Sequence, residues 1–122
     1  MPGAAAALFI VATTLLGPGS QIVVARPNYA TNLETPRAIG ADVAFLDLHH
    51  DDAWRVDPER LRSLLTPETR LVSLTSPHNP TRPGHRPSRR CARSWPWSRR
   101  TREHDLLVDE TYREMTFGGS PR

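Results

Sequence analysis

The chain has 122 residues, which limits it to one domain with a modest hydrophobic core and is short for a complete cofactor-dependent enzyme. Its formal net charge is +3, and all 16 of its basic residues are arginines, so the sequence contains no lysine. The single cysteine, Cys91, excludes an internal disulfide framework and a zinc site built from cysteines. A reducing compartment is the default for such a chain, and the expected localisation is cytoplasmic.

The first predicted element is a helix over residues 4–16, a run that contains only apolar residues and threonine. It begins after Gly3 and stops at the glycines and proline of residues 17–19. Two other interpretations remain open for this run. A secretory signal segment has this length, but no basic residue precedes it, and a membrane span needs about 20 apolar residues. We favour a buried helix.

An alternation of strands and helices follows. Residues 21–25 predict a buried strand, residues 31–39 a helix interrupted by Pro36, and residues 43–48 a second strand. Asp57 and Pro58 predict the start of a helix over residues 57–65. Three leucines form one apolar side of this helix. Residues 70–75 form a third predicted strand. The order strand, helix, strand predicts parallel pairing and an α/β fold.

Residues 49–52, His-His-Asp-Asp, contain side chains that can bind metal ions. Consecutive side chains diverge on any regular backbone, so four in a row seldom converge on one ion. We therefore expect a solvated loop here and predict no metal site.

Polar and aromatic side chains follow the predicted strands at the points where they end. Tyr29 follows the first strand, Asn79 the third, and Asp109 ends a further short apolar strand over residues 106–109. The carboxyl ends of parallel strands meet at one edge of a sheet, where ligands collect. We expect Asn79 and Asp109 to lie within reach of one bound ring. The alternative for Asp109 is a strand-end carboxylate that caps a following helix. Tyr29 either lies flat on such a ring or is a half-exposed loop residue.

The composition changes abruptly after the third strand. Residues 82–103 are rich in arginine and proline, and the chain has no Leu, Ile, Val, Met or Phe between Thr75 and Asp105. Three interpretations remain open for this segment. The first is that it is translated out of frame between two compensating insertions or deletions. The second is that it is a disordered insertion. The third is that it binds nucleic acid through phosphates and base stacking. We favour the frameshift.

Several motifs resemble one family, the class I/II aminotransferases, which are fold-type-I enzymes that use pyridoxal phosphate (PLP). Residues 76–81, Ser-Pro-His-Asn-Pro-Thr, resemble its Asn-Pro-Thr-Gly signature, and residues 109–112, Asp-Glu-Thr-Tyr, resemble its Asp-x-x-Tyr. Residues 3–4, 16–19 and 26–29 resemble the same family in the same order. The resemblance covers most of residues 3–81 and 104–119, and the chain departs from it at Arg82, where the family has glycine.

The resemblance implies PLP as the cofactor and gives roles to residues of the first half of the chain. The amides of Gly3 and Ala4, at the start of the first helix, match those that cradle the cofactor phosphate. Tyr29 matches the aromatic residue that stacks on the PLP ring.

The resemblance also implies roles for residues at the later strand ends. Asn79 and Tyr112 match residues that form hydrogen bonds with the phenolic oxygen of the ring. Asp109 matches the carboxylate that keeps the pyridinium nitrogen protonated. The family further implies a cis peptide bond between Asn79 and Pro80.

The expected fold is therefore α/β, a partial three-layer sandwich with a mainly parallel sheet, and a truncated form of the large domain of PLP-dependent transferases. Residues 1–81 are expected to be the N-terminal part of that domain, residues 82–103 an aberrant or disordered segment, and residues 104–122 a continuation of the domain. The expected function is that of an aminotransferase fragment, from a family that moves amino groups between amino acids and 2-oxo acids.

The resemblance also bears on activity and partners. The family uses a lysine to hold PLP as a Schiff base, and this sequence has none, so we assign no catalytic residue and expect the polypeptide as given to be inactive. The family is usually homodimeric, and no membrane partner is expected. The alternative function is that of a small, non-enzymatic, arginine-rich protein that binds nucleic acid.

Overall fold

The computed structural model describes residues 3–79 and 104–112. Each predicted helix and strand forms, and each observed end lies within one residue of the predicted one. The elements in chain order are α1 (Gly3–Leu15), β1 (Gln21–Arg26), α2 (Ala30–Ala38), β2 (Asp42–Asp47), α3 (Pro58–Leu64), β3 (Thr69–Thr75) and β4 (Asp105–Asp109).

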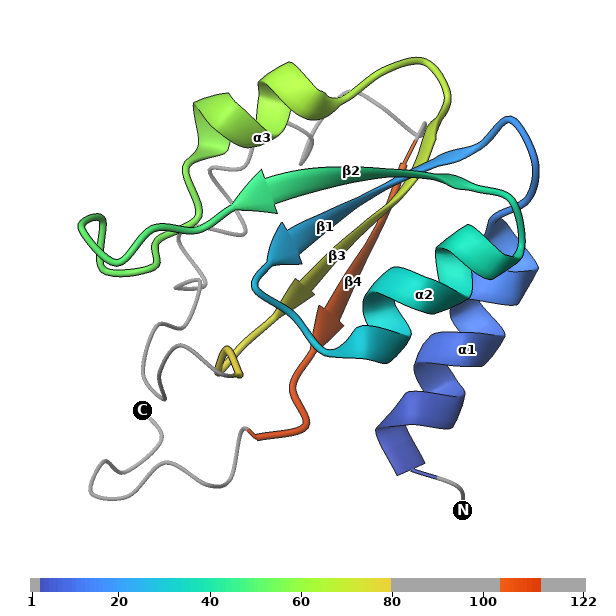
Figure 1. Ribbon diagram of the computed structural model, residues 1–122, viewed down its shortest axis with the longest axis horizontal. Helices are drawn as coiled ribbons and strands as arrows, with labels where there is room; N and C mark the ends of the chain where they lie inside the picture. The colour runs from blue at the N-terminus through green and yellow to red at the C-terminus, as the bar shows by residue number, and fades with distance from the viewer. Residues whose placement is uncertain (1–2, 80–103, 113–122) are drawn as a thin grey trace.

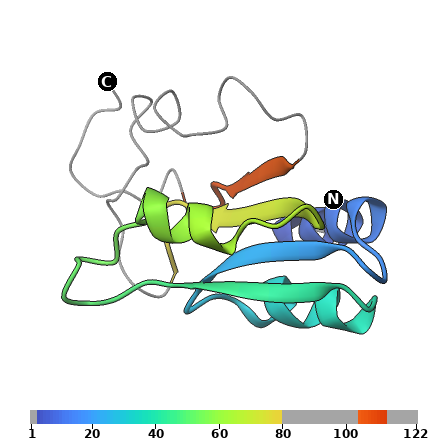
Figure 2. The same cartoon turned by 90° about the horizontal axis from the view of Figure 1, so that it is seen from above.

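The four strands form one sheet in the order β2-β1-β3-β4, and every described pair is parallel. Figure 2 shows the strands in this order. The arrowheads of all four strands point to the same edge of the sheet (Figure 1). The segments that follow β1, β3 and β4 therefore all begin at that edge, as the sequence predicts.

Helices cover both faces of the sheet and make three layers. Helices α1 and α2 lie together on one side, and α3 lies on the other (Figure 1). The core beneath α3 is formed by alternate residues of β1, β2 and β3, by one leucine just after β2 and by one leucine of α3: Val23, Ala25, Leu46, Leu48, Leu61, Val72 and Leu74. The core beneath α1 and α2 is formed by Ala12, Leu16, Ile22, Val24, Ala41 and Leu71. The predicted fold class, α/β with a parallel sheet, is confirmed.

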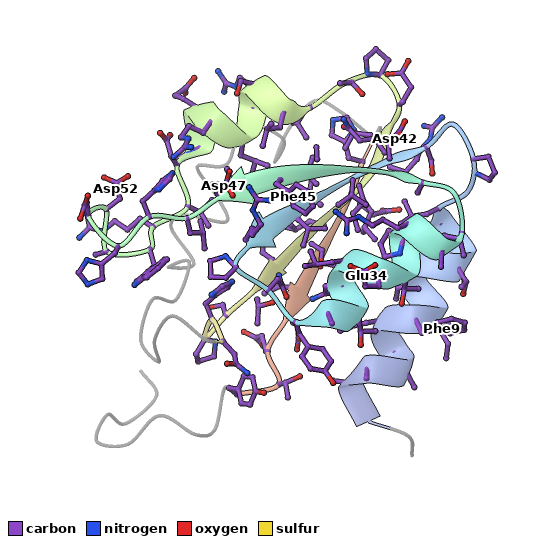
Figure 3. All side chains as sticks on the ribbon, in the orientation of Figure 1. Phe9, Glu34, Asp42, Phe45, Asp47 and Asp52 are labelled. Atoms are coloured by element: carbon purple, nitrogen blue, oxygen red, sulfur yellow. The ribbon has the colours of Figure 1, made fainter. Side chains whose placement is uncertain are left out.

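Helix α1 is less buried than the sequence predicts. Leu8 and Ala12 are its buried residues, whereas Phe9 and Ile10 have exposed fractions of 52% and 60%. Figure 3 shows Phe9 on the outer side of the helix, away from the sheet. The expectation of a buried helix is therefore wrong for its outer face. A run that is apolar on all sides has no polar stripe to mark the face that meets solvent.

Helix α2 continues through Pro36, where the sequence predicts an interruption. A proline inside a helix removes one backbone hydrogen bond and crowds the preceding turn. The Pro36 ring is fully buried, so its packing offsets part of this cost.

Helix α3 begins as its sequence predicts. The Asp57 carboxylate accepts hydrogen bonds from the backbone N–H groups of Glu59 at 2.9 Å and Arg60 at 3.5 Å, and Pro58 occupies the first turn. Leu61 is completely buried against the sheet. This cap fixes where the helix starts and so which leucines face the core.

Residues 49–54 form a loop of turns after β2, as predicted, and Ala53 and Trp54 adopt positive φ angles of 51° and 59°. Within residues 3–79 and 104–112, no group of three or more His, Cys, Asp or Glu side chains is arranged to hold a metal ion. No helix in the same residues is long and apolar enough to cross a membrane.

Candidate functional site

The loops at the carboxyl edge of the sheet surround one cavity of about 230 Å³. A backbone hydrogen bond of 2.9 Å from the Ser76 N–H to the Asp109 carbonyl ties the loop after β3 to the end of β4. The cavity is lined by Ala4, Ala5, Leu8, Asn28, Tyr29, Thr75, Asn79, Asp109, Thr111 and Tyr112. The lining residues therefore come from α1 and from the ends of β1, β3 and β4.

The structure brings the predicted site residues together around this cavity, with one exception. Ala4, Tyr29, Asn79, Asp109 and Tyr112 all line it. Gly3, the first residue of α1, has a φ of +77° and lies outside the lining. The predicted cis bond between Asn79 and Pro80 lies outside the described residues. The cis bonds of the described segment precede Pro27 and Pro77.

Asn79 and Tyr112 meet although they are far apart in the sequence. The Asn79 Nδ2 donates a hydrogen bond of 2.9 Å to the Tyr112 hydroxyl. Because this hydroxyl accepts from Asn79, its own proton is directed elsewhere and can be donated to a ligand. The pair therefore presents two adjacent polar groups to one point of the cavity.

The Asp109 carboxylate is half-buried and fixed on one side. Its Oδ1 accepts hydrogen bonds from the Thr111 N–H at 3.0 Å and the Thr111 hydroxyl at 2.5 Å. Its Oδ2 has no hydrogen-bond partner in the described part of the chain. The turn at Thr111 thus orients the carboxylate and leaves one oxygen to receive a donor.

Thr75 was not predicted as a site residue but pairs with Asp109 across the sheet and lines the same cavity. Its Oγ1 is buried and lacks a hydrogen-bond partner among the residues that the structure describes. A buried hydroxyl without a partner costs free energy, and a polar ligand could satisfy it. Nothing in the sequence indicates this position, since a threonine at a strand end is common.

His78 lies half-buried in the loop beside Asn79. Burial lowers the pKa of its imidazole below its usual value, so the ring is uncharged at neutral pH.

The site also contains Asn28, which the sequence reasoning missed. Its side chain holds the turn between β1 and α2, where Tyr29 has an exposed fraction of 62%. The available signal was an asparagine just before a helix start, a position where its side chain often bonds to the local backbone.

A parallel α/β sheet whose carboxyl edge gathers an aromatic ring, an amide, a hydroxyl and a carboxylate around one cavity is typical of ligand-binding domains. The sequence model of the family "Aminotransferase class I and II" matches residues 1–122. The chain belongs to this family.

Relatives and solved structures agree with this assignment. The chain is 36% identical to the arginine–pyruvate transaminase AruH of Pseudomonas aeruginosa over 98% of its own length and 30% of that relative. It is 30% identical to an aspartate/prephenate aminotransferase of Thermus thermophilus, over 96% of the chain and 30% of the relative. The solved structure of Escherichia coli YbdL, described with a methionine aminotransferase function, has a TM-score of 0.78 and 28% identity, over 90% of this chain and 28% of that one.

The chain spans about 30% of the length of these curated relatives. The comparisons lend no support to the alternative of a nucleic-acid-binding protein. The arginine-rich residues on which that alternative depends lie outside the described part of the structure.

Proposed function

We propose that this chain forms part of the cofactor site of a PLP-dependent aminotransferase, which transfers amino groups between an amino acid and a 2-oxo acid. The observation that carries the proposal is the hydrogen bond between Asn79 and Tyr112, formed at a cavity that Asp109 and Tyr29 also line. Membership of the aminotransferase family supports it independently.

The side chains around the cavity fit the chemistry of PLP. The ring nitrogen needs a carboxylate, and Asp109 Oδ2 has no partner in the described segments. The ring oxygen needs hydrogen-bond donors, which the pair of Asn79 and Tyr112 supplies. The face of the ring needs an aromatic partner, and Tyr29 lies at the cavity with its side chain exposed. The buried Thr75 hydroxyl is a further group that a polar ligand would satisfy.

When bound, PLP supplies an electron sink for the substrate. Asp109 would hold a proton at the ring nitrogen, and the turn at Thr111 keeps that carboxylate oriented. Asn79 and Tyr112 would position the ring through its oxygen, while Tyr29 would cover one face and exclude water from it.

The phosphate of the cofactor is proposed to bind at the start of α1. Ala4 lines the cavity, and the first amides of a helix are free to bind an anion. Gly3 is kept in this proposal for its backbone amide, although it is not among the lining residues.

We also propose substrates, an assembly and a compartment, and membership of the family supports them. The amino donor is an amino acid, the assembly is a homodimer, and the compartment is the cytoplasm. Residues 82–103 are proposed to interrupt an otherwise continuous large domain formed by residues 1–81 and 104–122. The absence of lysine limits this chain to binding PLP without covalent attachment through a lysine side chain.

The proposal is tested by titrating the chain with PLP and following the circular dichroism of the cofactor absorption band. Replacing Asp109→Asn should weaken binding about 10- to 100-fold, because a charge-assisted hydrogen bond is worth about 1.5–3 kcal/mol. The matched control is Asp105→Asn, which changes an exposed carboxylate at the opposite end of the same strand. Equal affinities for the wild type and Asp109→Asn would contradict the proposal.

A further inference from the structure

The turn between β1 and α2 is held together by one side chain. Asn28 Nδ2 donates to the Ala25 carbonyl at 2.9 Å, and its Oδ1 accepts from the Tyr29 N–H at 2.7 Å. The same Oδ1 accepts from Asn32 Nδ2 at 3.0 Å. The donor end of the amide thus bonds to the end of β1, and the acceptor end bonds to the start of α2.

The orientation of the Asn28 amide is determined by its partners. The Ala25 carbonyl can only accept and the Tyr29 N–H can only donate, so a flipped amide would lose both bonds. Asn32 reinforces this orientation and is itself 94% buried, with an exposed fraction of 6%. Buried amides are costly to leave unpaired, so the Asn28–Asn32 bond is not easily exchanged for water.

Tyr29 depends on this arrangement for its direction. It is the N-cap residue of α2, yet its own side chain makes no cap hydrogen bond, and its ring is largely exposed. Its backbone is held on both sides, because its carbonyl also accepts from the Asn32 N–H at 3.0 Å. The backbone therefore sets the direction of the Tyr29 Cα–Cβ bond, from which the ring extends.

We infer that Asn28, supported by Asn32, is a positioning residue that fixes the backbone of Tyr29 so that its ring lies against the ligand in the cavity. Asn28 itself also lines the cavity. The identity of the ligand as PLP rests on the proposed function, but the role of Asn28 toward Tyr29 does not.

The first test needs no ligand and measures hydrogen exchange of the Tyr29 amide by NMR in the full chain. Replacing Asn28→Ala should accelerate this exchange about tenfold, since one hydrogen bond is worth about 0.5–1.5 kcal/mol. Asn28→Asp keeps an acceptor for the Tyr29 N–H and should restore most of the protection. The control is Glu34→Ala, which changes an exposed side chain of α2 and should leave the exchange of the Tyr29 amide unchanged.

Unchanged exchange in Asn28→Ala would overturn the inference. If Asn28→Ala does not fold, Asn32→Ser is measured instead, because it removes the bond from Asn32 Nδ2 to Asn28 Oδ1. It should accelerate Tyr29 exchange, and wild-type exchange in a folded Asn32→Ser chain would count against the inference in the same way.

The second test uses PLP as the probe and a double-mutant cycle. Asn28→Ala should weaken PLP binding about 5- to 10-fold in a chain whose far-ultraviolet circular dichroism is unchanged. If Asn28 acts through the ring, the double variant with Tyr29→Ala should bind no more weakly than Tyr29→Ala alone.

The outcomes separate this inference from the proposed function. Additive losses in the cycle would overturn the positioning role. A wild-type chain that does not bind PLP, but whose Tyr29 exchange responds to Asn28→Ala, would overturn the proposed function and leave the positioning role intact.

Discussion

Two buried hydroxyl groups on β3 have different surroundings. Ser73 Oγ and Thr75 Oγ1 are both buried without hydrogen-bond partners among the described residues. Thr75 lines the cavity, where a ligand could reach it. Ser73 is paired with Val24 on one side and Leu107 on the other, in the middle of the sheet. Burial of the Ser73 hydroxyl therefore lowers the stability of the fold, and the hydroxyl does not line the cavity where a ligand could satisfy it.

Replacing Ser73→Ala should stabilise the chain by about 1 kcal/mol, because it removes a buried polar group that has no partner. The measurement is the free energy of unfolding in urea. Ser63→Ala is the control, since the exposed Ser63 hydroxyl donates to the Arg60 carbonyl and its loss should have a small destabilising effect. A Ser73→Ala chain less stable than the wild type would show that the hydroxyl is satisfied in solution.

The Arg26–Asp47 ion pair at the ends of β1 and β2 predicts a dependence on pH. Arg26 Nε lies 2.6 Å from Asp47 Oδ1, and its guanidinium also stacks 4.4 Å from the centre of the Phe45 ring. Phe45 and Asp47 both belong to β2 and are labelled in Figure 3. The hydrogen bond from Arg26 lowers the pKa of Asp47 below its usual value. The pair therefore stabilises the fold above the unfolded-state pKa of Asp47, about 4, and this contribution is lost as pH falls through the lower folded-state value.

The wild-type thermal midpoint should consequently fall more steeply below about pH 4 than that of Asp47→Asn. The effect should be small because both side chains are exposed to solvent. Asp42→Asn, at the start of the same strand, is the matched control and should retain the wild-type pH profile. Superimposable profiles for wild type and Asp47→Asn would contradict the prediction.

Among the elements, the Asp57 cap of α3 is the clearest local determinant of structure. Replacing Asp57→Ala should destabilise the chain by about 0.5–2 kcal/mol, because two backbone N–H groups lose their acceptor. Chemical denaturation measures the change. Asp52→Ala, which removes an exposed carboxylate from the preceding loop, should change stability by less than about 0.5 kcal/mol. Equal effects of the two substitutions would show that the cap is not formed.

The elements also show which features can be predicted from sequence. The start of α3 follows from Asp57 and Pro58 because capping is a local rule. The exposure of Phe9 on α1 does not, because a helix that is apolar all round carries no information on which side meets the sheet. Asn28 was missed because its bonds depend on the turn that brings Ala25, Tyr29 and Asn32 around it.

At the scale of the molecule, the meeting of Asn79 with Asp109 and Tyr112 could be expected from the strand-end rule and the family resemblance together. The rule places polar residues at one edge but does not fix distances, so the Asn79–Tyr112 hydrogen bond is new information from the structure. The role of each residue toward a cofactor stays a prediction.

The absence of lysine predicts how the chain reacts with PLP. After addition of PLP, borohydride reduction and proteolysis, mass spectrometry should find no label on any side chain, because the sequence contains no lysine. Arginine remains protonated and does not substitute for lysine. A labelled side chain would contradict this prediction.

The hypothesis that residues 82–103 are read out of frame is tested by the nucleotide sequence. A shifted reading of this stretch should give glycine after Thr81, followed by a helix with one apolar side that could cover the sheet between β3 and β4. Stop codons in the shifted frame, or the lack of a helical apolar period, would disprove the hypothesis.

The cavity draws its lining from α1, the turn before α2 and the ends of β3 and β4, so a molecule bound there contacts segments that are distant along the chain. These segments are adjacent only when the sheet is assembled. Binding is therefore thermodynamically linked to folding of the whole described unit, and a ligand at 100 times its dissociation constant would add about 2.7 kcal/mol to the free energy of unfolding. A cofactor held at this edge would therefore act as a non-covalent cross-link between α1 and the ends of the strands.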